Sequence, residues 1–226
     1  MSKTSEVEHI VAYMARREVK KPSLSLTQQY LEGLEVVFEG TEPKIQRIAL
    51  DQESNRFEVY FPIKNERFFL VICVNTAPLV QIGWTYIQPG NSVYFAASSD
   101  DLTFEELQRI TTLRATDGGT KGQLRKNSPD DKFRYKFSHF TFEPIPERAY
   151  DMEEKLLQLL DKLETDTQGV QKLAKIADAG INVCQYDYAG FGSINGVSLD
   201  KSTIQRLAHL GLDIDFDLYA SGDSIK

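Results

Sequence analysis

The chain has 226 residues, of which 41% are hydrophobic and 26% charged, enough for one large domain or two small ones with real cores. The net charge of −7 is uneven: residues 1–90 carry 10 Lys and Arg against 11 Asp and Glu, a balance of −1, and residues 91–226 carry 16 against 22, a balance of −6. An acidic second half argues against a general nucleic-acid-binding protein, which needs a basic face to neutralise phosphates.

The sequence also bears on the compartment. Residues 1–6 lack the apolar core of a signal peptide, and no apolar run reaches the length of a membrane span. Cys73 and Cys184 each lie in an apolar, β-like run, which is typical of buried free thiols rather than of the disulfides of secreted domains. We therefore expect a soluble cytoplasmic protein with no membrane partner.

The first half has the pattern of one helix followed by strands. Apolar residues recur with helical spacing over residues 5–19, which predicts an amphipathic helix. Alternating patterns between turn residues then predict strands at residues 35–38, 45–50, 57–63, 67–75 and 83–87. The segment 68–74 is apolar on both sides, so it should be a central strand covered on both faces. The turn at residues 88–91 marks a boundary between domains.

The second half alternates strands and helices. In chain order it predicts a strand at 93–97, a helix at 102–113, a loop at 115–131, a strand from 132, helices at 151–163 and 167–179, a strand at 181–188, a helix at 198–210 and a strand at 212–219. Two helix starts are well specified, because Thr103 and Glu106 form a capping box and Asp151 is followed by Glu154 three residues later. A stripe of apolar side chains should bury the helix that begins after Asp151; its members are Met152, Leu156, Leu159, Leu160 and Leu163.

The last strand places aspartates on one face and apolar residues on the other. Asp213, Asp215 and Asp217 alternate with apolar residues over the segment 212–219, the pattern of a half-buried strand. Residues 132–137 have a matching design, with Lys and Arg alternating with aromatic residues. Since opposite charges across strands attract weakly, we expect these two strands to be neighbours.

These patterns together predict an α+β fold. An alternating strand needs one exposed face, so the helices should cover mainly the other face of its sheet. We expect two-layer sandwich architecture, with a C-terminal β-α-β-α-β-α-β half whose helices lie mainly on one face of the sheet, and an N-terminal helix followed by a mostly antiparallel sheet. The domains predicted are residues 1–90 and residues 91–226.

The second half resembles a known bacterial family, the domain of unknown function 4279. The resemblance covers roughly residues 91–221 and depends on the order and spacing of four segments: Asp101 to Leu107, the loop Thr116 to Gly122, the helix Asp151 to Leu163, and the ending Asp213 to Tyr219. The family has no established activity, so the resemblance implies a fold and a bacterial origin. Domains of this size and class recur as immunity proteins beside secreted toxins. Residues 1–90 resemble no family that we recognise.

The acidic side chains are candidates for contacts with a partner. Asp213, Asp215 and Asp217 are separated by bulky residues in an extended chain, whereas Ca²⁺ sites gather their oxygens in tight, glycine-containing loops. We therefore expect no metal here, but a solvated or salt-bridged face or an acidic stripe that binds a partner. Asp187, between two tyrosines, is either a pocket acid or an outward residue of its strand.

The loop around Lys121 has the composition of a phosphate-binding loop without its order. A P-loop lysine is followed by Ser or Thr at the start of a helix, whereas Lys121 follows a predicted helix and precedes Gly122. A flexible loop is the simpler interpretation. Lys121, Gly122 and Arg125 remain candidates for contacts with an anion or ligand.

No catalytic or cofactor-binding arrangement emerges from the sequence. The three histidines lack metal-ligand spacing with one another or with the cysteines, and no serine or cysteine lies in a nucleophile elbow. We expect a non-enzymatic binding protein without cofactors, which meets a basic protein partner through its acidic half; a toxin-neutralising immunity protein is the most concrete version. The alternative is a small-ligand-binding protein or hydrolase with a pocket between the two halves. The sequence leaves the oligomeric state open.

Overall fold

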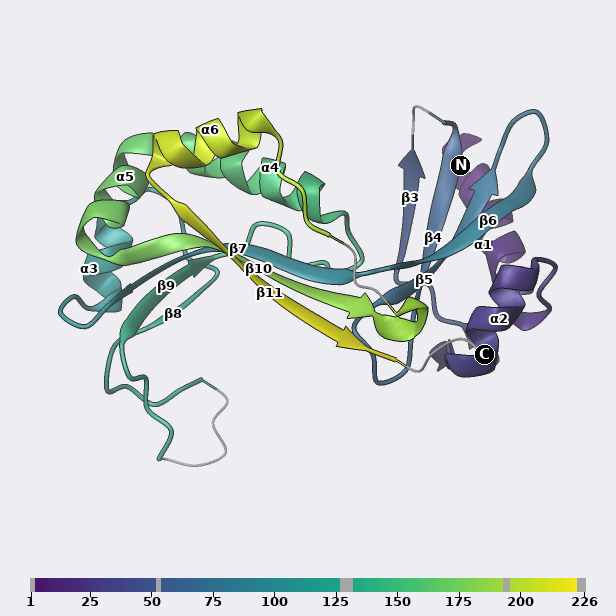
Figure 1. Ribbon diagram of the computed structural model, residues 1–226, viewed down its shortest axis with the longest axis horizontal. Helices are drawn as coiled ribbons and strands as arrows, with labels where there is room; N and C mark the ends of the chain where they lie inside the picture. Colours follow the sequence, from purple (N-terminus) through teal and green to yellow (C-terminus); the bar gives the residue numbers. More distant parts are fainter. Residues whose placement is uncertain (1–2, 52–53, 127–131, 193–195, 223–226) are drawn as a thin grey trace. The chain divides into compact units, whose positions relative to one another are not determined.

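In the computed structural model, residues 3–51, 54–126, 132–192 and 196–222 are described, and the chain divides into two compact units (Figure 1). Unit 1 comprises Met1–Gly90, Tyr186–Gly196 and Leu218–Lys226, and unit 2 comprises Asn91–Gln185 and Val197–Asp217. This division differs from a single cut after residue 90, because the ends of the last two strands count with unit 1. No helix among the described residues is both long and apolar enough to cross a membrane.

Unit 1 is a four-stranded sheet with two helices. Its elements are α1 (Lys3–Lys20), α2 (Ser25–Gly33), β1 (Phe38–Glu39), β2 (Glu42–Pro43), β3 (Arg47–Asp51), β4 (Arg56–Pro62), β5 (Phe69–Asn75) and β6 (Gln81–Gln88). The sheet is antiparallel in the order β3-β4-β5-β6, and β1 and β2 form a separate hairpin. Apolar side chains of α1 and of the strands share one core. Six of the seven residues of β5 are buried, which confirms the predicted central strand.

A buried carboxylate holds the turn between α1 and α2. Glu18, at the end of α1, is 2% exposed and accepts hydrogen bonds from the N–H groups of Ser23 and Leu24, at 2.9 and 3.0 Å. The Ser23 hydroxyl donates to the same carboxylate at 2.6 Å. The N-cap residue of α2, Leu24, has no side chain that could cap the helix. The carboxylate of Glu18, which belongs to α1, therefore accepts the hydrogen bonds that fix where α2 begins.

Unit 2 is a five-stranded sheet with helices on one face (Figure 1). Its elements are β7 (Gly90–Ser99), α3 (Phe104–Ile110), β8 (Asp117–Gly119), β9 (Ser138–Phe142), α4 (Met152–Glu164), α5 (Thr167–Ile176), β10 (Asp178–Tyr188), α6 (Lys201–Leu210) and β11 (Asp213–Ser221). The 3₁₀ turn η1 (Ala189–Phe191), which follows β10, counts with unit 1. The strand order is β11-β10-β7-β9-β8, with β9 antiparallel to both β7 and β8, whereas β10 and β11 run in the same direction. The helices α3 to α6 cover one face, which confirms the predicted α+β sandwich.

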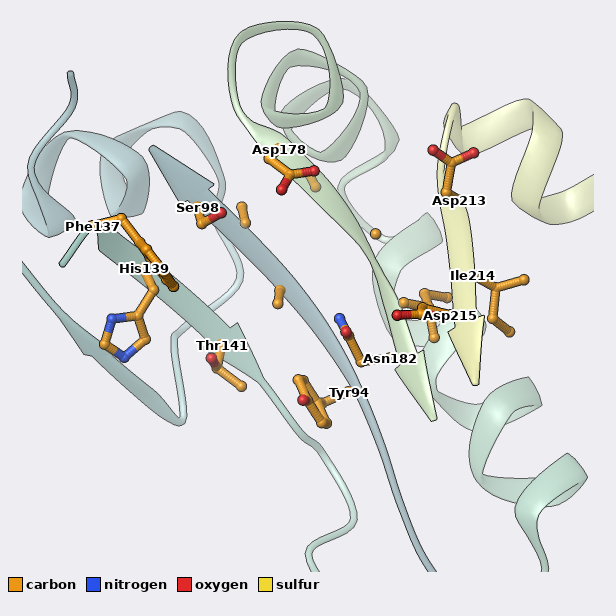
Figure 2. Close-up of a pocket in the computed structure, with 15 residues that line it drawn as sticks. Tyr94, Ser98, Phe137, His139, Thr141, Asp178, Asn182, Asp213, Ile214 and Asp215 are labelled. Carbon is orange, nitrogen blue, oxygen red and sulfur yellow. The ribbon is translucent and has the colours of Figure 1, made fainter. Parts of the chain in front are cut away.

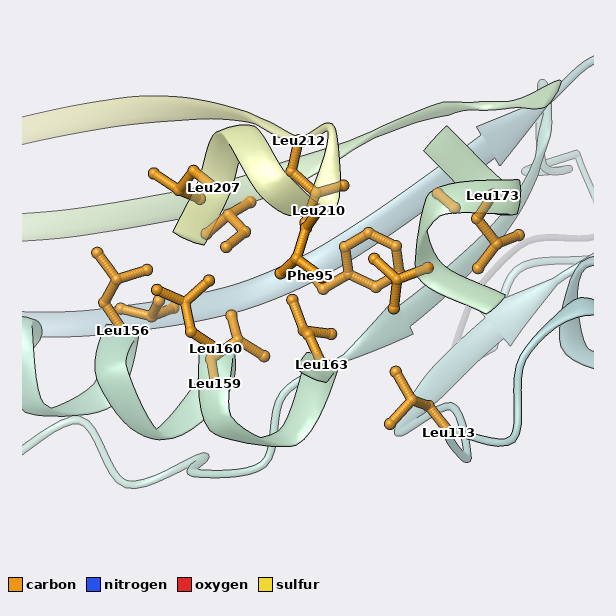
Figure 3. Packing of buried hydrophobic residues seen from close by; sticks show 14 of the residues in the cluster. Phe95, Leu113, Leu156, Leu159, Leu160, Leu163, Leu173, Leu207, Leu210 and Leu212 are labelled. Atoms are coloured by element: carbon orange, nitrogen blue, oxygen red, sulfur yellow. The ribbon is translucent and has the colours of Figure 1, made fainter. Parts of the chain in front are cut away.

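The core of unit 2 lies between this helix layer and the sheet (Figure 3). All five residues of the predicted stripe on α4 are buried: Met152, Leu156, Leu159, Leu160 and Leu163. They pack in one cluster with Phe95 of β7, Phe140 of β9 and Leu207 of α6. Among the described residues of unit 2 no helix lies on the opposite face of the sheet, because the polar alternate residues of its strands cannot be buried without partners.

The predicted pairing of the last strand with residues 132–137 is wrong. Among the described residues the only strand that pairs with β11 is β10, and Arg134 instead bridges Leu124 in a neighbouring loop. Phe133 and Phe137, expected on a buried face, are 54% and 50% exposed. Exposed charge pairs contribute only about 0.2–1 kcal/mol, so burial of Ile214 and Phe216 beside the core decides where β11 lies.

Several element boundaries differ from those expected. The Thr103–Glu106 capping box and the Asp151 cap form as predicted. The short strand β8 interrupts the segment expected to be a loop, and the strand expected from residue 132 begins at Ser138. The helix α5 ends at Ile176, since residues from Asp178 onward already pair in the sheet.

Candidate functional site

A hollow of about 610 Å³ lies on the helix-free face of unit 2, and we call it the trough (Figure 2). It crosses the strands β9, β7, β10 and β11. Its polar and aromatic lining consists of Tyr94, Ser98, Phe137, His139, Thr141, Asp178, Asn182, Asp213 and Asp215. Every lining residue belongs to unit 2, so the trough is complete within one unit.

Small side chains make the floor of the trough. Along β7 the residues in the core are Val93, Phe95 and Ala97, whereas the alternate open-face positions include the small residues Ala96 and Ser98. On β10 the open-face position beside them is Gly180, where an added Cβ would lie 3.1 Å from the carbonyl oxygen of Asp213. The period-2 alternation of these strands therefore sets both the packed core and the hollow behind it.

Three carboxylates form one side of the trough. Figure 2 shows Asp178 on β10 and Asp213 and Asp215 on β11, all on the side away from β9. The three side chains are exposed, and within residues 3–51, 54–126, 132–192 and 196–222 none of them forms an ion pair with Lys, Arg or His. Like charges repel, so this side of the trough has an excess of negative charge that an incoming cation would relieve.

The opposite side is formed by β9 and is weakly charged. His139 is half-buried, and its Nε2 lies 3.9 Å from Asp117 Oδ2, too far for a hydrogen bond. Burial lowers the pKa of His139 below its ordinary value of 6.5, against the opposing effect of Asp117 and with help from Lys126. The imidazole is therefore neutral at pH 7. Asp117 itself is held by Lys126, whose Nζ donates to Oδ1 at 2.7 Å and lowers the pKa of that carboxyl group.

A hydrogen-bonded chain of three side chains lies on the same open face. The Tyr94 hydroxyl donates to the Cys184 thiol, and the thiol donates to Asp217 Oδ2 over 3.8 Å. Burial and then the neighbouring thiol and carboxylate raise the pKa of Tyr94 to about 12. Burial and Asp217 also raise the pKa of Cys184, so this thiol is not an activated nucleophile.

Two of the four predicted acidic candidates line the trough, and the other two lie outside it. Asp213 and Asp215 line the trough, and Asp217 follows them on β11 and binds the thiol. Asp187 belongs to unit 1 and is 1% exposed, so of the two predicted alternatives, a pocket acid or an outward residue, the outward residue is wrong. Burial therefore excludes Asp187 from any surface that a protein partner contacts directly.

The three loop candidates lie in an ordered hairpin. Lys121 Nζ donates to Asp100 Oδ1 at 2.7 Å, so the positive charge that an anion would need is already paired with a carboxylate. Gly122 adopts a φ of +82°, and its N–H donates to the carbonyl oxygen of Tyr135 at 2.9 Å. The guanidinium of Arg125 lies 6.0 Å from the ring centre of Tyr135. The predicted flexible loop is thus held by pairing with residues 133–135, and its candidates do not converge on a shared cavity.

Sequence reasoning missed most of the trough. Asp178 and Asn182 of β10 and Thr141 of β9 were not predicted as site residues. The available signal was the alternation of polar or small residues with apolar ones along β7 and β10, but that pattern does not say which strands are neighbours. Across the described ranges no group of three or more His, Cys, Asp or Glu side chains has the geometry to hold a metal ion.

Comparison with known proteins gives one match. No curated protein and no solved structure matches the chain. The family model described as a domain of unknown function (DUF4279) matches residues 88–221, more than half of the chain, and confirms the resemblance recognised over residues 91–221. This range contains the whole helix-covered sheet and every residue that lines the trough. The chain therefore belongs to the DUF4279 family.

Proposed function

We propose that the protein is a non-enzymatic binding protein whose trough holds a positively charged segment of a partner protein. The observation that carries the proposal is the row of carboxylates Asp178, Asp213 and Asp215 along one side of a hollow of about 610 Å³, none of which forms an ion pair with any described residue. Side chains on alternate residues of a strand are about 6.5–7 Å apart, which suits successive Lys or Arg side chains of an extended segment.

The remaining sides of the trough fit the same class of ligand. Tyr94 and Phe137 offer aromatic rings, which attract Lys and Arg side chains as well as apolar groups. His139 is neutral at pH 7, so it does not repel a cation. The small residues Ala96, Ser98 and Gly180 keep the floor of the trough low. The −6 balance of residues 91–226 would also steer a basic partner toward this half.

The most specific form of the proposal is a toxin-neutralising immunity protein. A toxin that attacks nucleic acid must present a basic surface to the phosphates, and a row of carboxylates can cover such a surface. In this form the partner is a basic nucleic-acid-binding enzyme of the same bacterium or its neighbours.

The test compares the wild-type chain with the variant Asp213→Asn/Asp215→Asn. Each chain is immobilised and used to capture proteins from a bacterial lysate at low and high salt, and a short oligolysine peptide is titrated against each chain in parallel. We expect wild type to capture a basic protein at low salt only, and the variant to bind the peptide about tenfold more weakly, or about 1.4 kcal/mol.

The matched control is Glu153→Gln/Glu154→Gln, on the helix α4 that covers the other face of the sheet. It removes the same charge and should leave peptide binding within about twofold of wild type. Binding that is independent of salt, or that the control weakens as much as the trough variant does, would remove the trough from the proposal. A ligand found instead by a thermal-shift screen of small molecules would favour the alternative, a small-ligand-binding protein or hydrolase.

A further inference from the structure

The helix α1 of unit 1 has a second hollow, of about 350 Å³, on its exposed side. Its lining includes Tyr13, Arg16, Arg17, Lys20 and Lys21, with Glu42 of the β1–β2 hairpin. Of the five named side chains other than Tyr13, four are cationic and one is anionic, in a chain whose net charge is −7. A volume of this size is within the range of small-molecule sites.

Two parallel rows of the helix surface enclose the hollow. Tyr13, Arg17 and Lys21 are each four residues apart, so they follow one ridge of the helix over about 12 Å of its length. The backbone N–H of Lys21 donates to the carbonyl oxygen of Arg17 at 2.8 Å, so this row stays in helical register to its end. The neighbouring row consists of Ala12, Arg16 and Lys20, which also line the hollow.

The four cations are not equivalent. Arg16 Nε donates to the carbonyl oxygen of Pro43 at 3.1 Å, and Lys20 Nζ pairs with Glu42 Oε1 at 2.5 Å. These contacts hold two of the cations in place. Within the described ranges, which omit residues 1–2, 52–53, 127–131, 193–195 and 223–226, no side-chain hydrogen bond or ion pair engages Arg17 or Lys21. Two free positive charges thus stand beside a preformed hollow.

The position of these residues in the helix explains only part of this arrangement. Cations in the last turn of a helix stabilise it by about 0.3–1 kcal/mol through the helix dipole, which explains why lysines stand at positions 20 and 21. The dipole does not explain the ring of Tyr13, two turns earlier, which is 66% exposed. Like charges at Arg17 and Lys21, four residues apart, also destabilise a helix slightly. An anion between them would remove that repulsion.

We propose that this hollow binds a small phosphorylated ligand with a flat aromatic body, the chemical class of a nucleoside monophosphate. The phosphate lies between Arg17 and Lys21, whose two charges match its charge of about −1.5 to −2 at neutral pH. The aromatic body stacks against Tyr13 at the other end of the row. Arg16 and Lys20 add positive potential without having to move.

The experiment is a calorimetric titration of the full chain with adenosine monophosphate, adenosine and inorganic phosphate as separate probes. We expect the monophosphate to bind, and to bind more tightly than either of its parts. Arg17→Gln/Lys21→Gln should weaken binding of the monophosphate and of inorganic phosphate by about tenfold or more, because charged hydrogen bonds are lost. Tyr13→Ala should weaken binding of the monophosphate about tenfold and leave inorganic phosphate unchanged, because only stacking is lost.

The control variant is Lys172→Gln/Lys175→Gln on α5, which removes two exposed helical lysines from unit 2 and should leave all three affinities unchanged. An oligoglutamate peptide that binds better than the monophosphate would overturn the proposal in favour of an acidic protein partner. Absence of monophosphate binding at millimolar concentration, or equal loss in the control variant, would overturn it outright. Because the trough variants do not touch α1, failure here leaves the proposed function to its own test.

Discussion

The buried carboxylate of Glu18 accepts a hydrogen bond from the backbone N–H of Leu24, six residues further along the chain. Through this contact the end of α1 fixes the start of α2, which has no capping side chain of its own. Desolvation by burial acts to raise the pKa of Glu18, but the hydrogen bonds from Ser23 and Leu24 together outweigh it and the pKa is lowered. The turn between the two helices therefore depends on an ionised, buried group.

Replacing Glu18 should destabilise the protein. Glu18→Ala leaves two backbone donors unsatisfied, so we expect a loss of about 1–3 kcal/mol in the free energy of unfolding, measured by urea denaturation. Glu18→Gln keeps an acceptor and should lose less. Because the folded-state pKa lies below the ordinary 4.5, this contribution is present above that pH and disappears as the pH falls through the folded-state value. Glu32→Ala, on the exposed side of α2, is the control and should have little effect.

The leucine stripe of α4 provides a sharper comparison on one helix. Leu163 is fully buried in the core of unit 2, whereas Leu157 of the same helix is 43% exposed. Leu163→Ala should cost about 2–5 kcal/mol, because it removes buried methyl groups and leaves a cavity. Leu157→Ala should change stability by less than about 0.5 kcal/mol. Equal effects in urea denaturation would mean that α4 does not pack as described.

This stripe shows which parts of the fold can be predicted from the sequence. A helix that buries one face repeats its apolar residues locally, and Asp151 marks its start, so both are visible in a short window. The helix α2 cannot be predicted from a short window of sequence, because Glu18, which fixes its start, belongs to another helix and its own N-terminal residue makes no cap. Local signals predict elements well when the stabilising contacts are themselves local.

Strand pairing and the trough depend on contacts between distant residues. The prediction that joined the aspartates of β11 to residues 132–137 relied on surface charge, which is worth little in water. The strand β11 instead follows β10, where Ile214 and Phe216 pack against the core. Because the trough combines side chains from four strands, its residues could be recognised together only once the strand order was known.

The thiol of Cys184 should respond to its neighbour Asp217. Burial is the largest cause of the raised pKa of the thiol, and the Asp217 carboxylate is the second. Asp217→Asn should therefore lower that pKa. At a fixed, mildly alkaline pH the rate of alkylation by iodoacetamide should then increase by about three- to tenfold. Alkylation is followed on the Cys184 peptide by mass spectrometry. Cys73, whose pKa is raised to about 12 by burial, serves as the slow internal reference.

A matched variant separates this contact from the general loss of negative charge. Asp213→Asn removes the same charge from the same strand, but Asp213 makes no contact with the thiol and is not a cause of its pKa shift. Its alkylation rate should equal that of wild type. If the two variants react at the same rate, the hydrogen bond between Cys184 and Asp217 is not what suppresses the thiol.

The neutral state of His139 makes binding in the trough dependent on pH. Its pKa is lowered by burial and by the neighbouring Lys126 and Arg125, and raised by Asp117, with a net shift below 6.5. Protonation below that value adds a positive charge to the side of the trough opposite the carboxylates, and a cationic ligand is then repelled. Oligolysine binding should therefore weaken in wild type as the pH falls below 6.5 and through the folded-state pKa of His139.

His139→Gln, which cannot be protonated, should keep more of its affinity over the same interval, and the trough carboxylates are common to both chains. His209→Gln, on the helix α6 that covers the other face of the sheet, should behave like wild type. A histidine whose folded-state pKa is depressed also stabilises the fold less as the pH falls, so circular dichroism must show that each chain stays folded. Parallel loss of affinity in wild type and His139→Gln would mean that protonation of His139 is not what makes binding depend on pH.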